Sequence, residues 1–317
     1  MPDTLLSCDW GTTNLRLCRV EIETGRLLQA TSAAAGARAV FDAWREAGGD
    51  RLEHYSDVVR PLLERLGRRE TDRALVISGM ASSSIGIAEL PYARVPFRLD
   101  GSDLAWRVME TSLGAFPLLL LSGVRTEEDV MRGEETQMIG LRRSGGAPPS
   151  PASYVLPGSH SKHVRVEEDS IVSFRTCMTG EIFELLSTAS VLSASVAEAP
   201  FEEAAFRRGV HVSRDLPGGL FTVRTNQLFE RLRPEENYWY LSGMLVGWEL
   251  AELAGTSGEP IRIVGEPPLG GVYRAALEAL GAGGRTELVE DHLAQRSAVD
   301  GHLVAYRTLL GGSEDQV

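Results

Sequence analysis

The sequence has few cysteines and no apolar run long enough to cross a membrane. Its 317 residues include three cysteines, Cys8, Cys18 and Cys177, whose spacing fits neither a disulfide framework nor a zinc motif. The longest apolar run, residues 116–121, is far shorter than the roughly 20 residues that a membrane helix needs. No signal-peptide pattern is present either. We therefore expect a cytoplasmic protein with no membrane partner.

Basic side chains are outnumbered, and lysine is almost absent. The chain has 32 Lys+Arg against 44 Asp+Glu, a net charge of −12, which argues against a broad basic surface and a nucleic-acid partner. Lys162 is the only lysine. A genomic preference for arginine explains why lysine is rare but not why position 162 has one. Either this lysine is present by chance, or its position needs a compact ammonium rather than a planar guanidinium.

The length and hydrophobic patterning predict two α/β domains. A strand–turn–strand pattern at residues 5–20 returns at residues 154–166, about 148 residues later, as a quasi-repeat. Between the two, residues 142–153 are dense in turn formers, so we expect domains at 1–148 and 149–317. Helical spacing is expected within residues 41–66, 133–141, 180–192, 226–232, 240–254 and 271–280, and further strands at 74–78, near 118 and at 261–264.

Two turns carry glycine and hydroxyl groups directly after a strand. In the first, Asp9 is followed by Gly11, Thr12, Thr13 and Asn14, which offers a carboxylate for Mg²⁺ beside N–H and O–H donors for phosphate oxygens. The same residues are common in ordinary hairpin turns, so spacing alone leaves both interpretations open.

The second turn has Gly158, Ser159 and His160 next to Lys162. The coincidence of the sole lysine with a phosphate-type turn favours a functional role. Two such turns facing each other would hold phosphates from opposite sides.

A pair of carboxylates, Glu134 and Glu135, begins a predicted helix after Arg132. Helix dipole and capping favour acidic residues there in any protein. In the functional interpretation one carboxylate is the general base toward a sugar hydroxyl, and Arg132 neutralises an acid substrate or the transferred phosphoryl group.

Four ordered motifs resemble the 2-dehydro-3-deoxygalactonokinase family: DWGTTNLR (9–16), MRGEETQ (131–137), PGSHSK (157–162) and FRTCMTGE (174–181). The resemblance implies the actin-like ATPase superfamily, with two ribonuclease-H-like domains on either side of a nucleotide cleft. It implies ATP-dependent phosphorylation of the 6-hydroxyl of 2-dehydro-3-deoxy-D-galactonate, with ATP, Mg²⁺ and the sugar acid as ligands. A homodimer is one candidate assembly.

The resemblance also implies residue roles. Asp9 would orient Mg²⁺ through water, the first turn and the second turn would be the phosphate loops, and Lys162 would neutralise charge. The Glu-Glu pair resembles that of exopolyphosphatases in the same superfamily, which favours Glu135 over Glu134 as the base. The remaining candidates are Gly265 and Gly270 for adenosine, and Arg16, Met80, Ser82, Tyr92, Arg132, Thr179 and Glu181 for the acceptor substrate.

Two departures keep alternatives open. The second loop lacks the acidic residue usual in the superfamily, and the loop at residues 265–270 is an imperfect adenosine motif, so nucleotide preference is not fixed. A kinase for another 2-keto-3-deoxy sugar acid, a polyphosphate or nucleotide phosphohydrolase, and a non-catalytic nucleotide sensor are the rival interpretations.

Overall fold

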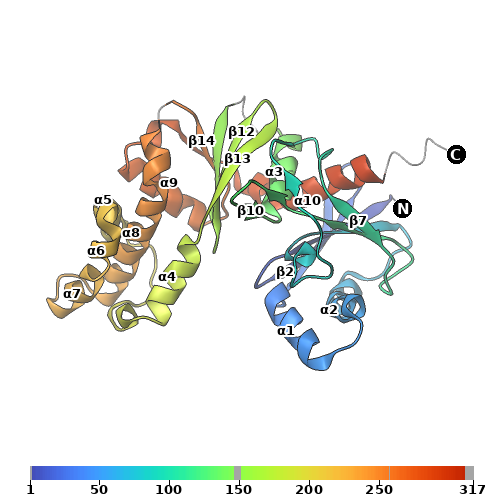
Figure 1. Cartoon of the computed structure of the whole chain (residues 1–317), viewed down its shortest axis with the longest axis horizontal. Coiled ribbons are helices and arrows are strands. Elements are labelled where there is room, and N and C mark those ends of the chain that lie inside the picture. Colours follow the sequence, from blue (N-terminus) through green and yellow to red (C-terminus); the bar gives the residue numbers. More distant parts are fainter. Residues whose placement is uncertain (1, 146–150, 257, 311–317) are drawn as a thin grey trace. The chain divides into compact units, whose positions relative to one another are not determined.

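The computed structural model describes residues 2–145, 151–256 and 258–310, which form two compact units (Figure 1). Unit 1 contains residues 2–145, 168–173 and 292–310, and unit 2 contains residues 151–167, 174–256 and 258–291. Part of the expected domain boundary, residues 146–150, lies outside the described residues. Among the described helices, none combines the length and the apolar character needed to cross a membrane.

Unit 1 is built on a six-stranded sheet in the order β3-β2-β1-β4-β8-β7. The hairpin of β1 and β2 and the pairing of β2 with β3 are antiparallel, whereas β4 is parallel to both β1 and β8. The strands predicted at residues 5–9, 15–20, 74–78 and near 118 are confirmed. Their bounds are β1 Thr4–Trp10, β2 Leu15–Glu21, β3 Leu27–Ala33, β4 Asp72–Gly79, β7 Trp106–Met109 and β8 Leu118–Leu121.

Two helices, α1 (Ala37–Ala47) and α2 (Arg51–Leu66), cover one face of this sheet and pack on its core (Figure 1). The helical spacing expected over residues 41–66 is therefore divided. Gly48 and Gly49 have φ of 71° and 89°, which end α1, and the Asp50 carboxylate accepts a hydrogen bond of 2.8 Å from the first turn of α2.

A buried ion pair ties three elements of unit 1 together. Arg19 on β2 is fully buried and donates to both carboxylate oxygens of Asp72 on β4, at 2.8 and 2.9 Å. It also donates to the carbonyl oxygens of Leu66 and Gly67 at the end of α2. Because each charge is matched by hydrogen bonds, its burial is tolerated, and removing one partner would leave the other charge buried alone.

The helix that carries the acidic pair, α3 (Glu134–Arg143), is held by the last helix, α10 (Asp291–Leu309). A Cβ on Gly140 would lie 1.8 Å from the carbonyl oxygen of Ser297, and one on Gly301 would lie 2.0 Å from that of Thr136. Only glycine permits so close a crossing. This contact explains why residues 292–310 belong to unit 1, although the sequence analysis placed them in the domain 149–317.

Shorter elements complete unit 1. The 3-10 turn η1 (Met80–Ser82) follows β4, and a small three-stranded sheet has the order β10-β9-β5. The strand β6 pairs with the beginning of β13, residues 170–171. Their bounds are β5 Ala93–Arg94, β6 Phe97–Arg98, β9 Val124–Arg125, β10 Val130–Met131 and β13 Ser170–Cys177.

Unit 2 repeats the strand arrangement of unit 1. Its sheet runs β13-β12-β11-β14-β15, with β11 antiparallel to β12 and β14 parallel to both β11 and β15. In both units the first four sheet strands along the chain thus lie in the spatial order third, second, first, fourth, and a parallel strand, β8 in unit 1 and β15 in unit 2, follows the fourth. This shared order agrees with the predicted pair of ribonuclease-H-like folds. The bounds are β11 Ala152–Leu156, β12 Ser161–Glu167, β14 Ile261–Ile263 and β15 Thr286–Leu288.

The helices of unit 2 surround a largely buried helix, α8, which packs against α5 and α9. Those expected at 180–192, 240–254 and 271–280 are found, whereas of residues 226–232 only the first three are helical. The helix α5 has no counterpart in the prediction. The bounds are α4 Thr179–Thr188, η2 Val191–Ser195, α5 Glu203–Val212, η3 Ser213–Asp215, α6 Leu216–Gly219, α7 Thr222–Leu228, α8 Pro234–Gly255, α9 Leu269–Ala279 and η4 Gly283–Arg285.

Candidate active site

In unit 1, Asp9 lies at the end of β1 beside two glycines. Gly79 and Gly133 have φ of 83° and 104°. A Cβ on Gly79 would lie 3.4 Å from Oδ1 of Asp9, and a Cβ on Gly133 would lie 3.9 Å from it. These backbones therefore bring the end of β4 and the start of α3 against the carboxylate. Burial and the negative charge of Glu134 raise the pKa of Asp9 to about 6, while the positive charge of Arg16 opposes that rise.

The two glutamates at the start of α3 differ in environment. Glu135 is 0% exposed, and its carboxylate accepts from the Gly133 N–H and the Thr136 hydroxyl, each at 2.8 Å. Glu134 is partly exposed and accepts from the Arg132 N–H at 3.0 Å. Burial, and then the charge of Glu134, raise the pKa of Glu135 to about 8. Asp9, Glu134 and Glu135 thus form one acidic group, in which the pKa values of Asp9 and Glu135 are raised.

Three of the predicted substrate residues come together beside this group. The Arg132 guanidinium donates from Nε to the Tyr92 hydroxyl at 2.8 Å and from Nη1 to the Ser82 Oγ at 3.0 Å. It also stacks over the Tyr92 ring, 3.9 Å from its centroid. The guanidinium is thereby fixed in one orientation. Met80, in contrast, packs against the hydrophobic core of unit 1.

The first predicted phosphate loop is a tight turn between β1 and β2. The Gly11 N–H donates to the Asn14 carbonyl at 2.8 Å, and Thr12, Thr13 and Asn14 are exposed. A Cβ on Gly36, just before α1, would lie 1.9 Å from the Thr12 carbonyl oxygen. The turn therefore packs directly against the residue that precedes α1. Arg16, on β2, is paired with Asp9 across the hairpin.

In unit 2, the second predicted phosphate loop joins β11 to β12. Lys162 is 4% exposed, and its Nζ donates to the His160 carbonyl at 2.8 Å. The His160 ring contacts the Glu181 carboxylate, and the Glu181 N–H donates to the Ser159 carbonyl at 3.1 Å. Glu181, expected at the acceptor substrate, thus contacts two residues of the second predicted phosphate loop.

The start of α4 packs onto this loop by way of another glycine. A Cβ on Gly180 would lie 2.6 Å from the Gly158 carbonyl oxygen and 2.8 Å from the Ser159 Cα. Thr179, the other residue expected at the acceptor from this motif, is buried at the same helix start. The PGSHSK and FRTCMTGE motifs are therefore parts of one structure.

The predicted adenosine loop joins the same group. A Cβ on Gly265 would lie 3.2 Å from the Gly270 Cα and 3.3 Å from the Pro157 Cγ, and a Cβ on Gly270 would lie 2.7 Å from the Gly265 carbonyl oxygen. The loop at residues 265–270 is thus folded tightly on itself and packed against the first residue of the second turn.

Sequence reasoning missed the residues that hold these groups in place. Gly36 behind the first loop and Thr136 beside Glu135 were not selected. The run of small residues 33–36 before α1 was the available signal for Gly36. Thr136 lies inside the MRGEETQ motif, but no rule of spacing shows that its hydroxyl turns back to the preceding glutamate.

The chain has the fold of the actin-like ATPases, with a carboxylate cluster in unit 1 and glycine-braced loops in both units. Solved structures agree on the fold: the activator of 2-hydroxyisocaproyl-CoA dehydratase from Clostridium difficile is 12% identical, with a TM-score of 0.53 and coverage of 99% of this chain and 98% of that one. At that identity the likeness concerns the fold alone.

Closer relatives identify the family. The family model for 2-keto-3-deoxy-galactonokinase matches residues 9–299, so the chain belongs to this family of sugar-acid kinases. The 2-dehydro-3-deoxygalactonokinase of Escherichia coli (strain K12) is 31% identical over 288 residues, 87% of this chain and 90% of that protein. DgoK1 of Rhizobium meliloti (strain 1021), named as a probable 2-dehydro-3-deoxygalactonokinase, is 32% identical over 296 residues, 86% of this chain and 88% of that protein.

A crystal structure of a Sinorhizobium meliloti protein, provisionally assigned as 2-dehydro-3-deoxygalactonokinase, has a TM-score of 0.81 with this chain. It is 28% identical and covers 97% of each chain.

Proposed function

We propose that this kinase transfers the γ-phosphoryl group of ATP to the 6-hydroxyl of 2-dehydro-3-deoxy-D-galactonate, with Mg²⁺. The observation that carries the proposal is the acidic group of Asp9, Glu134 and Glu135 in a chain of this family. Phosphoryl transfer needs positioning and charge neutralisation more than covalent chemistry. The carboxylates can position Mg²⁺ and the acceptor hydroxyl, and the neutralising charge would come from the ion and from Lys162.

Glu135 is the proposed general base. With a pKa of about 8, only a minor fraction of Glu135 is ionised at neutral pH, but that carboxylate is a strong enough base to take a proton from a hydroxyl. Its two hydrogen bonds, from Gly133 and Thr136, fix the orientation of the carboxylate and leave further lone pairs on each oxygen. Glu134 acts through its charge, which raises the pKa of the base.

Asp9 is the proposed ligand of a Mg²⁺-bound water. Burial and then the negative charge of Glu134 raise the pKa of its carboxyl, and a nearby divalent cation would oppose that rise. Carboxylate oxygens are the donors that Mg²⁺ prefers, so the residues fit the ion. When bound, the ion supplies charge neutralisation for the phosphates. Asp9 would hold its water shell, and Arg16 would limit the protonation of Asp9.

Arg132 is the proposed contact for the substrate carboxylate. Its Nε and Nη1 donate hydrogen bonds to Tyr92 and Ser82, and among the described residues none accepts a hydrogen bond from Nη2. A guanidinium held in this way presents a fixed donor to an anion, at a low entropic cost for binding.

The phosphates are assigned to the two glycine turns, and adenosine to the loop at residues 265–270. The second turn is supported by the ammonium of Lys162, whose position is fixed by its hydrogen bond to the His160 carbonyl of the same turn. Support for the first turn is its row of exposed threonine and asparagine side chains directly beyond Asp9.

The test is a coupled assay of ADP release with ATP and Mg²⁺ across a panel of 2-keto-3-deoxy sugar acids. The proposal predicts ADP release that depends on the acceptor and is fastest with 2-dehydro-3-deoxy-D-galactonate. Equal ADP release without any acceptor would indicate a phosphohydrolase instead, and a faster rate with another acid would reassign the substrate.

The compartment and the assembly are part of the proposal. We expect the enzyme in the cytoplasm, where its three cysteines stay reduced. The homodimer stays a prediction, to be tested by light scattering.

A further inference from the structure

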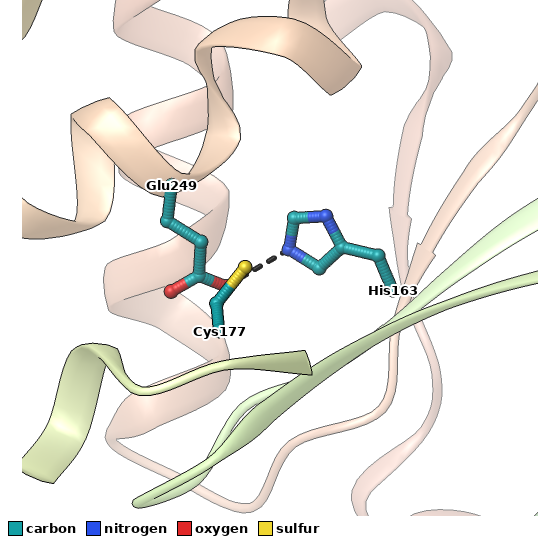
Figure 2. A group of neighbouring side chains, drawn as sticks. All are labelled: His163, Cys177 and Glu249. Carbon is teal, nitrogen blue, oxygen red and sulfur yellow. Dashed lines mark hydrogen bonds and ion pairs between the residues drawn. The ribbon is translucent and has the colours of Figure 1, made fainter. Parts of the chain in front are cut away.

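A cluster of metal-ligand side chains lies within unit 2, apart from the residues assigned to catalysis. His163 on β12, Cys177 at the end of β13 and Glu249 on α8 point toward one another (Figure 2). The potential ligand atoms, an imidazole nitrogen, the thiol sulfur and a carboxylate oxygen, all lie within 4.8 Å of one another. We propose that this cluster is a binding site for a soft divalent cation, with Zn²⁺ as the best match.

The donor set selects the class of metal. Thiolate and imidazole are ligands for zinc and its neighbours in the first transition row, whereas Mg²⁺ and Ca²⁺ take oxygen ligands. Zinc bonds are about 2.3 Å to sulfur and about 2.0–2.2 Å to nitrogen and oxygen, so tetrahedral ligand atoms lie roughly 3.3–3.7 Å apart. The His163 Nε2 and the Glu249 Oε1 are 2.9 Å apart, and no pair exceeds 4.8 Å. Shifts of about 1 Å would therefore complete the site.

A second layer of hydrogen bonds already orients the carboxylate. Tyr273 on α9 donates from its hydroxyl to Glu249 Oε2 at 2.8 Å, and the Ser161 Oγ lies 2.7 Å from the same hydroxyl. Glu249 is buried, so this oxygen is fixed while Oε1 faces the cluster. Such outer partners are typical of metal sites, where they set the ligand orientation.

The cluster has a route to solvent. A surface pocket of about 300 Å³ is lined by Cys177, Glu249 and their neighbours Arg175, Arg214, Trp248 and Glu252. A cation could enter there, and a water molecule could occupy its fourth position. On binding, the thiol proton would leave to solvent, and the imidazole proton would reside on Nδ1, away from the metal.

The experiment is a titration of the metal-free full chain with Co²⁺, a spectroscopic substitute for Zn²⁺. The proposal predicts a thiolate-to-cobalt charge-transfer absorption that saturates at one Co²⁺ per chain and is bleached by Zn²⁺ but not by excess Mg²⁺. Cys177→Ser abolishes this absorption. Tyr273→Phe retains it and weakens Co²⁺ affinity by about ten- to a hundredfold, as expected for an outer partner.

Two controls isolate the site. Cys18→Ala removes a thiol from unit 1, and Glu252→Gln removes a carboxylate that lines the same pocket but belongs to an ion pair with Arg175. Both should bind Co²⁺ as the wild type does. If Cys177→Ser does not fold, His163→Gln provides the same test through loss of an imidazole ligand.

Absence of the charge-transfer band in the wild type, or an equal band in Cys177→Ser or His163→Gln, would overturn the proposal. In that case the cluster is only a buried hydrogen-bond network.

Discussion

Replacing Glu135 with glutamine should stabilise unit 1 in a pH-dependent way while it removes the proposed base. Glutamine copies the shape of the protonated carboxyl. Its oxygen can still accept from the Gly133 N–H, and the Thr136 hydroxyl can rotate to accept from its amide. The variant therefore keeps the hydrogen bonds of the neutral side chain and can never carry the buried charge.

The magnitude follows from the pKa of Glu135, raised from 4.5 to about 8. Each pKa unit corresponds to about 1.4 kcal/mol, so the full effect is about 5 kcal/mol as an upper value. The unfolded chain loses this proton near pH 4.5 and the folded chain only near pH 8, so the wild type loses stability as pH rises between those values. The advantage of Glu135→Gln should therefore grow from pH 5 to pH 8 and level off above.

The assay is urea unfolding of both proteins at intervals from pH 5 to pH 9, followed by tryptophan fluorescence, since Trp10 is buried in the core of unit 1. Glu46→Gln, at an exposed position on α1, is the matched control and should give a difference that does not change with pH. Turnover should collapse in Glu135→Gln while ATP affinity stays close to that of the wild type. A stability difference that is flat from pH 5 to pH 8 would refute the assigned burial of charge, and near-normal turnover would remove Glu135 from the role of base.

Three further substitutions test other parts of the site. Glu134→Gln removes the charge that raises the pKa of both neighbouring carboxyls, so the acid limb of the kcat/KM profile should move to lower pH; an unmoved limb would contradict this coupling. Gly36→Ala should lower kcat/KM for ATP by about a hundredfold, because its Cβ would displace the first turn and a misplacement of about 1 Å costs that much. The control Gly255→Ala has open space around it and should leave kcat/KM unchanged. Equal kinetics in the two variants would show that the first turn does not hold phosphate. Lys162→Arg should reduce kcat/KM for ATP by about ten- to a hundredfold, because a planar guanidinium does not replace a buried ammonium that is bound to a carbonyl. A fully active variant would show that this position does not require lysine.

Local patterns predicted much of the fold. Alternating apolar residues located both hairpins, and their recurrence located two copies of one sheet topology, because strands buried on one or both faces leave a clear pattern. The division of residues 41–66 depends on the φ values of Gly48 and Gly49, and the position of α10 depends on Gly140 and Gly301 in helices far apart in sequence. Contacts of that kind leave no local periodicity.

The candidate site divides in the same way. Motifs selected Asp9, the glutamate pair and both turns as candidates, because their chemistry is local. The bracing of His160 by Glu181 and the fixing of Arg132 by Ser82 and Tyr92 arise only when distant segments meet. The cluster around His163 shows this most clearly, since its members come from three separate elements.

The position of the transferred phosphate tests the central claim most directly. After incubation with ATP, Mg²⁺ and 2-dehydro-3-deoxy-D-galactonate, ³¹P NMR should show a phosphate ester coupled to the protons on carbon 6, formed in step with ADP. No ester should form with the 6-deoxy analogue. Inorganic phosphate in place of the ester, or an ester at another carbon, would contradict the assignment of this chain to phosphorylation of the 6-hydroxyl.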